Sequence, residues 1–248
     1  MRVFLAGATG AIGRRLVPLL LGAGHAVVGT TRSEQKSAAL RDAGVEPVVV
    51  DVFDAPALTR AVSNADPDVV IHQLTDLPPG LDPAQMAAGT KRNARMRSEG
   101  TQNLVTAMLK CGATRLVAQS IAWMYAPGTK PHAEGDPLDL NAQGTRAITV
   151  AGVVALERLV VSSAPIDGIV LRYGRLYGPG TGTGSPGDAP TLHVDAAASA
   201  ALLAMGEASS GIYNIADAGE YLSIEKARRV LNFDPGFRIE QHPESHII

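Results

Sequence analysis

The chain has 248 residues, a formal net charge of −2 and 46% hydrophobic residues, so it can bury the core of one α/β domain. Its basic residues are scattered, which argues against a nucleic-acid partner, and no apolar run approaches the roughly 20 residues that cross a membrane. The single cysteine, Cys111, excludes an internal disulfide and is typical of a reducing compartment, so we expect a cytoplasmic protein.

The first part of the chain alternates short apolar strands with helices. We expect strands at 2–6, 25–31, 45–51 and 68–72, and helices at 11–23, 33–41 and 54–63. Strands that are apolar at nearly every position are typical of a parallel sheet covered by helices on both faces. The pattern therefore predicts an α/β fold built on a doubly wound parallel sheet.

The second part continues the alternation and then weakens. We expect a long helical region at 84–110, a strand at 114–120, a loop at 127–144, a helix at 148–163 and a strand at 166–173. After a Gly/Pro-rich stretch at 178–190 come an Ala-rich helix at 193–205, a short strand at 211–215 and a helix at 223–231. Residues 1–165 should form the main body, and residues 166–248 the last strand plus a smaller region packed on the same domain.

A glycine-rich turn lies between the first strand and the first helix. Its residues are Gly7, Ala8, Thr9, Gly10, Ala11, Ile12 and Gly13. In this context the first glycine permits a tight turn, the second lets the backbone approach a pyrophosphate, and the third lets the helix pack close to the strand. The free N–H groups of the helix N-terminus would bind the phosphates. The turn predicts a dinucleotide site.

The end of the second strand indicates which dinucleotide is bound. An acidic residue there would bind the ribose 2′-hydroxyl of NAD, but this chain has Thr31 and Arg32. A guanidinium can pair with a 2′-phosphate. We therefore expect NADP rather than NAD.

Further motifs follow in a fixed order. They are Asp51-Val52-Phe53-Asp54, Val70-Ile71-His72-Gln73-Leu74, Gly100-Thr101-Gln102-Asn103-Leu104, the run Leu171 to Gly180, His193-Val194-Asp195 and Tyr213-Asn214-Ile215. With the glycine turn, they resemble the short-chain dehydrogenase/reductase superfamily, in particular its extended or atypical branch of NAD-dependent epimerases and dehydratases. The resemblance implies a Rossmann fold with a small C-terminal substrate-binding region and hydride transfer at a carbonyl or alcohol carbon of a small molecule, which could be sugar-derived.

The resemblance also assigns cofactor-binding residues. Asp51 and Val52 would contact the adenine, and His72, Gln73 and Leu74 would line the cofactor after the fourth strand. Relatives often form dimers through their fourth and fifth helices, so the resemblance also makes a homodimer an option.

The catalytic positions depart from this family. Its enzymes use a Tyr-x-x-x-Lys pair, and counting back from Glu157 puts Val153 at the Lys position and Thr149 at the Tyr position. Neither side chain ionises near neutral pH. No Tyr in the chain is followed four residues later by Lys. Arg97 also stands where the family usually has Asn.

Other residues could supply the missing acid/base. Tyr125 follows the fifth strand and could donate a proton, with Ser120 polarising the substrate. His132 and Glu134 in the following loop are weaker candidates, and Arg172 should pair within the fold. No metal site is expected, because the His residues lack partners and Pro243 disfavours a helical pair of His242 and His246.

Two functions therefore remain open. The chain is either an atypical NAD(P)-dependent oxidoreductase or epimerase, with Tyr125 or a loop residue as acid/base, or a non-catalytic NAD(P)-binding sensor. The retained substrate-side motifs favour the first, and the missing pair favours the second.

Overall fold

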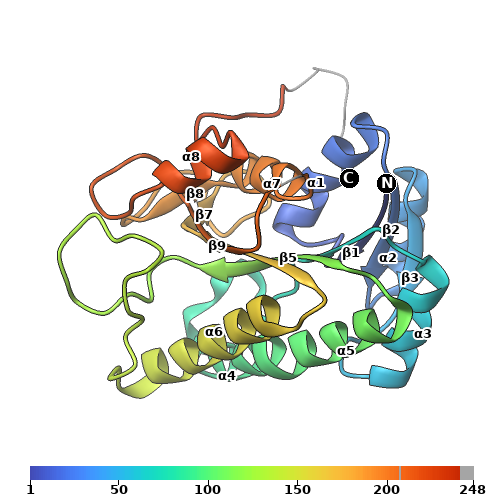
Figure 1. Cartoon of the computed structure of the whole chain (residues 1–248), viewed down its shortest axis with the longest axis horizontal. Coiled ribbons are helices and arrows are strands. Elements are labelled where there is room, and N and C mark those ends of the chain that lie inside the picture. The colour runs from blue at the N-terminus through green and yellow to red at the C-terminus, as the bar shows by residue number, and fades with distance from the viewer. Residues whose placement is uncertain (207, 241–248) are drawn as a thin grey trace.

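The structure is a computed structural model that describes residues 1–206 and 208–240. Its centre is a parallel sheet of seven strands in the order β3-β2-β1-β4-β5-β6-β9 (Figure 1). The strands are β1 (Arg2–Ala6), β2 (Ala26–Thr31), β3 (Glu46–Val49), β4 (Val69–His72), β5 (Arg115–Ile121), β6 (Asp167–Tyr173) and β9 (Gly211–Ile215). The strand order reverses between β1 and β4, which creates a crevice beyond the carboxyl ends of these strands. The predicted doubly wound parallel sheet is confirmed.

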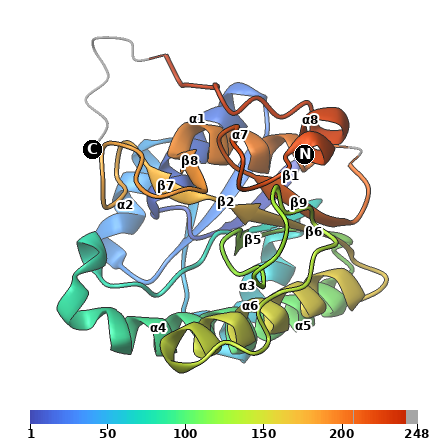
Figure 2. The same cartoon turned by 90° about the vertical axis from the view of Figure 1, so that its left-hand side faces the viewer.

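Helices cover both faces of the sheet. They are α1 (Ala11–Gly22), α2 (Glu34–Asp42), α3 (Ala55–Ala65), α4 (Met86–Arg95), α5 (Thr101–Cys111), α6 (Gly144–Ser162), α7 (Val194–Leu203) and α8 (Glu225–Leu231). Figure 2 shows α4, α5 and α6 together on one face, and α1, α7 and α8 on the other. No helix in the described ranges is long and apolar enough to cross a membrane.

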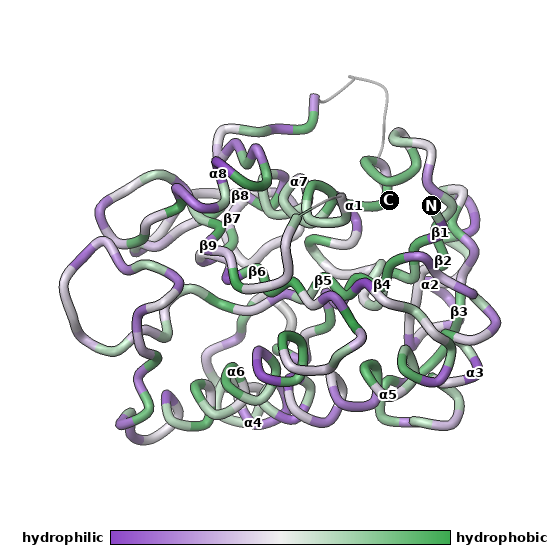
Figure 3. Tube along the Cα trace, in the orientation of Figure 1, coloured by the Kyte–Doolittle hydropathy of each residue, from purple (hydrophilic) through white to green (hydrophobic). Residues whose placement is uncertain are grey.

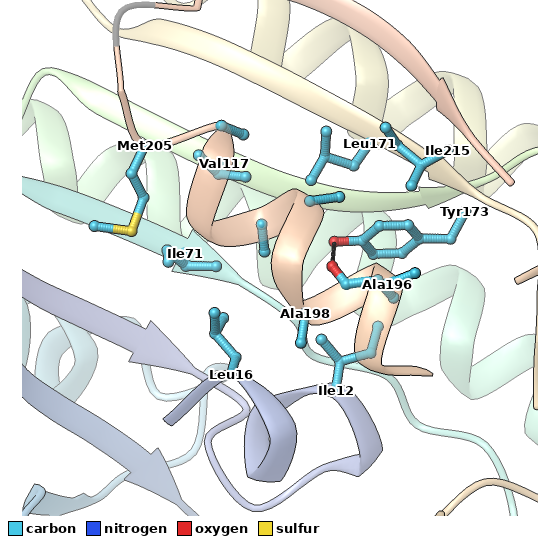
Figure 4. Packing of buried hydrophobic residues seen from close by; sticks show 14 of the residues in the cluster. Ile12, Leu16, Ile71, Val117, Leu171, Tyr173, Ala196, Ala198, Met205 and Ile215 are labelled. Atoms are coloured by element: carbon cyan, nitrogen blue, oxygen red, sulfur yellow. Dashed lines mark hydrogen bonds between the residues drawn. The ribbon is translucent and has the colours of Figure 1, made fainter. Parts of the chain in front are cut away.

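The apolar strands divide their side chains between two cores. In β1, Val3 and Leu5 join one cluster, whereas Phe4 and Ala6 join the other. This explains why the strand is apolar at successive positions, since each face lies under helices. Figure 3 shows the same strands as hydrophobic, and Figure 4 shows Leu16 of α1 and Ile71 of β4 in the first of the two clusters.

Two features differ from the sequence prediction. The long helical region at 84–110 is interrupted by a π-helical turn, Met96–Gly100, between α4 and α5. A separate two-stranded parallel sheet joins β7 (Arg175–Tyr177) to β8 (Thr191–His193). Neither strand was predicted, because three residues are too few to show a periodic pattern.

Candidate functional site

A cavity of about 890 Å³ opens beyond the carboxyl ends of the central strands. Gly7 follows β1, Thr31 ends β2, Gln73 follows β4, Ser120 lies near the end of β5 and Tyr173 ends β6, and all five line it. Ligands of open α/β sheets bind in this crevice. The cavity is therefore the candidate site.

Two glycines of the turn after β1 are required by its geometry. Gly7 has a φ of +98°, and a Cβ there would lie 2.9 Å from the carbonyl carbon and oxygen of Gln73. A Cβ on Gly13 would lie 2.2 Å from the carbonyl oxygen of Gly7 and 2.6 Å from that of Ala8. A larger residue at Gly13 would push α1 away from the turn after β1, and one at Gly7 would collide with the segment after β4. The close helix–strand contact expected at Gly13 is thus present in the structure.

The N-terminus of α1 faces the cavity with unpaired N–H donors. Gly10 precedes the helix and supplies no side-chain cap, and the first turn carries no acidic residue. Gly7, Thr9, Gly10, Ala11 and Ile12 line the cavity, while Gly13 lies behind them. Free N–H groups at a helix N-terminus bind phosphate without a further cation. The residues present fit a dinucleotide pyrophosphate.

The ribose end of the cavity is cationic. Thr31, Arg32 and Lys36 line it, and the Arg32 side chain is 58% exposed. No acidic residue ends β2 in the sequence, but Asp76 comes near from another segment: its Oδ1 is 3.8 Å from Arg32 Nη2 and 3.8 Å from Arg92 Nε. This single carboxylate is shared between two guanidinium groups, so a net positive charge remains.

Of the two residues predicted to contact the adenine, only Val52 lines the cavity. Val52 is buried and lines the cavity. Asp51 is not among the lining residues, and its Oδ1 accepts a hydrogen bond from Phe53 N at 2.9 Å. The carboxylate therefore fixes its own turn in this structure.

Of the three residues predicted to line the cofactor after β4, two line the cavity and one does not. Gln73 and Leu74 line the cavity, and Gln73 Oε1 is buried without a partner among the described residues, which leaves an acceptor for a ligand. His72 lies behind them: its Nδ1 accepts from Leu74 N at 3.2 Å, and Nε2 lies 3.0 Å from Thr101 Oγ1. Burial and the charge of Arg97 lower the pKa of His72 to about 4. A neutral His72 orients the segment rather than contacting the cavity.

Ser120 and Tyr125 belong to one hydrogen-bond network that runs through the Glu157–Arg172 pair, but only Ser120 lines the cavity. Ser120 lines the cavity, but its hydroxyl donates to Glu157 Oε1 at 2.8 Å. Glu157 also accepts from Arg172 Nη2 at 2.7 Å, so Arg172 pairs within the fold as expected. Tyr125 does not line the cavity; its hydroxyl donates to Asn214 Oδ1 at 2.6 Å and accepts from Arg172 Nη1 at 2.8 Å.

Tyr125 lies beyond the end of β5 at Ile121 and outside the cavity, although Trp123, two residues earlier, lines it. Its ring stacks on His132, and burial raises the pKa of its hydroxyl. His132 is itself buried beside Asp136, and Glu134 Oε1 accepts from Asn214 N at 2.9 Å. None of these side chains lines the cavity, so the geometry does not support Tyr125, His132 or Glu134 as an acid/base here.

The wall nearest the fifth and sixth strands holds one phenol, that of Tyr173. Burial raises the pKa of Tyr173 well above its ordinary value, and its hydroxyl donates to Ala197 O at 3.2 Å. Thr149 lines the same region from α6, and its Oγ1 donates to Thr145 O at 3.1 Å. Val153, one turn further, is fully buried. No side chain here is poised to deliver a proton.

Arg97 is a lining residue that the sequence analysis noted only as a departure from Asn. It lies on the π-helical turn, is 7% exposed, and makes no hydrogen bond or ion pair with any described residue. Burial lowers the pKa of Arg97 to about 10, partly offset by the charge of Glu157. The spacing of apolar residues predicted a continuous helix here, so no sequence signal revealed its position.

The charges lining the cavity are of one sign. Five cationic side chains line it: Arg14, Arg32, Lys36, Arg97 and Arg175. No carboxylate, imidazole or thiol of the described residues does so. Across residues 1–206 and 208–240, no group of three His, Cys, Asp or Glu is placed to hold a metal ion; His242 and His246 fall outside these ranges.

Comparisons with known proteins agree with this architecture. UDP-glucose 4-epimerase from Thermotoga maritima, solved with UDP-glucose, superposes with a TM-score of 0.78 at 18% identity, over 96% of this chain and 94% of that one. MoeE5 in complex with UDP-glucuronic acid and NAD gives a TM-score of 0.75 at 21% identity, over 94% and 93% of the two chains. At these identities the similarity establishes the fold alone.

Sequence comparison gives a nearer relative. The 3-diazoavenalumate denitrifying reductase of a Streptomyces species is 43% identical over an alignment 244 residues long, and the match covers 88% of this chain and 76% of that protein. The family model described as the NAD dependent epimerase/dehydratase family matches residues 3–210. The chain therefore belongs to the NAD-dependent epimerase/dehydratase family, as its motifs predicted.

Proposed function

We propose that this chain is a nicotinamide-dependent reductase that removes nitrogen from an aromatic diazo compound. The observation that carries the proposal is the absence of a proton donor from the described lining residues around Ser120, Thr149 and Tyr173. The 43% identical relative, named as a denitrifying reductase of a diazo carboxylate, supports the reaction class.

Reduction of a carbonyl needs a proton as well as a hydride, because the carbonyl oxygen becomes a hydroxyl. Ser120 is bound to Glu157, Thr149 has no accessible ionisation, and the Tyr173 hydroxyl is held by Ala197 O. A carbonyl substrate would therefore meet no acid in this part of the cavity. The arrangement argues for a reaction whose hydride step needs no proton.

Diazo reduction meets that condition. When bound, the reduced nicotinamide supplies a hydride. The substrate is considered in its diazonium form. The hydride brings an electron pair that forms a C–H bond at the carbon that carries nitrogen. The C–N bond breaks, and N₂ leaves with the electron pair of that bond. The carbon is reduced by two electrons, and no proton is consumed. The chain has only to bind both partners and hold the reacting carbon beside the hydride.

For the cofactor we propose a preference for NADP. Arg32 and Lys36 line the ribose end, and two guanidinium groups share Asp76 there. A 2′-phosphate would pair with these cations, whereas the 2′-hydroxyl of NAD would not need them. Arg32→Ala should weaken NADP binding about tenfold and leave NAD binding within about twofold, in line with one lost charge-assisted contact. A stronger loss for NAD than for NADP would contradict this preference.

The activity test uses diazotised 3-amino-4-hydroxybenzoate with NADPH that carries deuterium at the transferred position. We expect loss of NADPH absorbance, release of one N₂ per NADPH and deuterium on the ring carbon that carried nitrogen. UDP-glucose with NAD serves as the competing substrate. Epimerisation of the sugar nucleotide, or NADPH consumption without N₂, would overturn the proposal.

A further inference from the structure

We propose that Arg97 is the residue that binds the substrate anion. Its guanidinium would receive an oxyanion of the aromatic substrate, either a carboxylate or a phenolate, at the inner end of the cavity. The ligand class rests on the proposed function, whereas the position and charge of the site rest on the structure.

Three arginines are buried, and of these only Arg97 forms no pair with another described residue. Arg15 pairs with Asp195 at 2.5 Å and Arg172 pairs with Glu157 at 2.7 Å. Arg97 is as buried as Arg15, but forms no hydrogen bond or ion pair within the described residues. A buried charge without a partner is costly, so such groups are normally paired or bind a ligand. Because Arg97 lines the cavity, its partner can be a ligand.

An unusual backbone conformation carries Arg97. Arg97 lies on the π-helical turn that joins α4 to α5, and π-turns are frequent at functional sites. The preceding turn is packed tightly on α6, since a Cβ on Gly152 would lie 3.0 Å from Ala94 Cα. The nearest acidic influence, Glu157, is already bound to Arg172 and Ser120. The guanidinium therefore keeps its full charge for the cavity.

Cationic side chains line both the ribose end of the cavity and its other end, where Arg97 lies. Arg32 and Lys36 lie at the ribose end, where the cofactor phosphates would engage them. Arg97 is left without a counter-charge at the other end. A free diazonium cation would be repelled there, so the diazo substrate must carry its own negative charge. An oxyanion paired with Arg97 satisfies that requirement.

Two planar side chains in the cavity, Trp123 and Arg175, bear on the shape of the ligand. Trp123 lines the cavity, and the Arg175 guanidinium lies 4.7 Å from the centre of its ring. A flat indole beside a flat guanidinium offers a surface on which a planar aromatic ring can stack. An aromatic oxyanion fits both this surface and the cation of Arg97.

The test measures binding of diazo-free probes to the NADP-loaded protein. The probes are cinnamate, which carries a carboxylate, 4-nitrophenolate at about pH 8, which carries a phenolate, and cinnamyl alcohol, which carries neither. Quenching of Trp123, the only tryptophan, reports binding. We expect at least one anion to bind about tenfold or more tighter than the alcohol, and the tighter anion identifies the oxygen that Arg97 receives.

Variants assign the effect to Arg97. Arg97→Gln should weaken binding of that anion about 10- to 100-fold, Arg97→Lys less, and NADP affinity should stay unchanged. The control is Arg95→Gln, which removes an exposed arginine from the end of α4 that is not among the residues lining the cavity. Ligand-free Arg97→Gln should melt at an equal or higher temperature than the parent, since an unpaired buried cation is removed. A lower melting temperature would instead indicate a structural arginine.

The outcomes separate this inference from the proposed function. If the alcohol binds as tightly as both anions, or if Arg97→Gln binds anions normally, the inference is wrong whatever the enzyme reduces. If Arg97→Gln does not fold, the parent's preference for anions and the Arg97→Lys variant decide the question. Because no probe carries a diazo group, failure of diazo reduction leaves these measurements intact.

Discussion

The two ends of the cavity are built from different parts of the chain. At the cofactor end, backbone groups of the turn after β1 and the N-terminus of α1 form the site, and Gly7 and Gly13 touch other backbone atoms. At the substrate end, side chains of β5, α6 and the π-turn line the cavity. The cofactor end carries the glycine turn typical of the family, whereas at the substrate end Thr149 and Val153 stand where counting back from Glu157 predicts the family's acid/base pair.

This difference has a physical basis. A site made of backbone amides depends on the path of the chain, so changing one of its glycines moves a helix. A site made of side chains can change its chemistry while the same helix keeps its packing: Val153 is fully buried in α6 without any charge. The fold can therefore stay that of an epimerase while the reaction becomes another one.

The largest expected effect comes from breaking the backbone site. Gly13→Val places side-chain atoms where a Cβ alone would lie 2.2 Å from Gly7 O, so α1 must move off β1. Dinucleotide binding, measured by calorimetry, should be lost beyond about 100-fold, a difference of roughly 3 kcal/mol. The control is Gly22→Ala at the end of the same helix, where a Cβ meets nothing within 4 Å. Normal binding by Gly13→Val would show that the turn is not the phosphate site.

The next effect tests the layer behind the substrate end. Glu157→Gln leaves the buried Arg172 guanidinium without its counter-charge and weakens the hold on Ser120. Breaking one partner of a buried pair costs about 3–5 kcal/mol, which urea unfolding would measure. Glu99→Gln breaks an exposed pair with Arg95 and should cost less than about 1 kcal/mol. Equal losses in the two variants would contradict the view that the Glu157 pair holds the substrate end in place.

The sequence predicted the cofactor end better than the substrate end for related reasons. Apolar residues at successive positions, as in Val3 to Leu5, reveal a strand buried on both faces, and glycines reveal a turn made of backbone. Tyr125 follows β5 as expected, but its hydroxyl contacts Asn214 and Arg172 outside the cavity, and the sequence does not reveal such tertiary contacts. Arg97 was missed because the spacing of apolar residues predicts one continuous helix there and does not reveal the π-turn that carries Arg97.

A third prediction concerns His72, which lies between the two ends. Its folded pKa of about 4 is below the ordinary 6.5, so between these values the unfolded chain binds a proton that the folded chain does not. Stability therefore falls as the pH drops through this window, by on the order of 3 kcal/mol near pH 4. His72→Asn keeps an acceptor for Leu74 N but does not titrate. Urea midpoints of the parent and the variant should converge toward low pH; parallel curves would mean that His72 is not held neutral.

The smallest effect decides between structural and chemical roles for Tyr125. Its hydroxyl bonds to Asn214 and Arg172, and its ring stacks on His132 outside the cavity. Tyr125→Phe should lose about 1–2 kcal/mol of unfolding free energy, because two buried groups lose a partner while Arg172 keeps Glu157. Turnover of the diazo substrate and NADP affinity should stay within about twofold, since no proton passes through this hydroxyl. A drop in kcat of about 100-fold with unchanged melting would instead make Tyr125 the acid of the reaction, and the substrate end would then retain the proton chemistry that the lining residues lack.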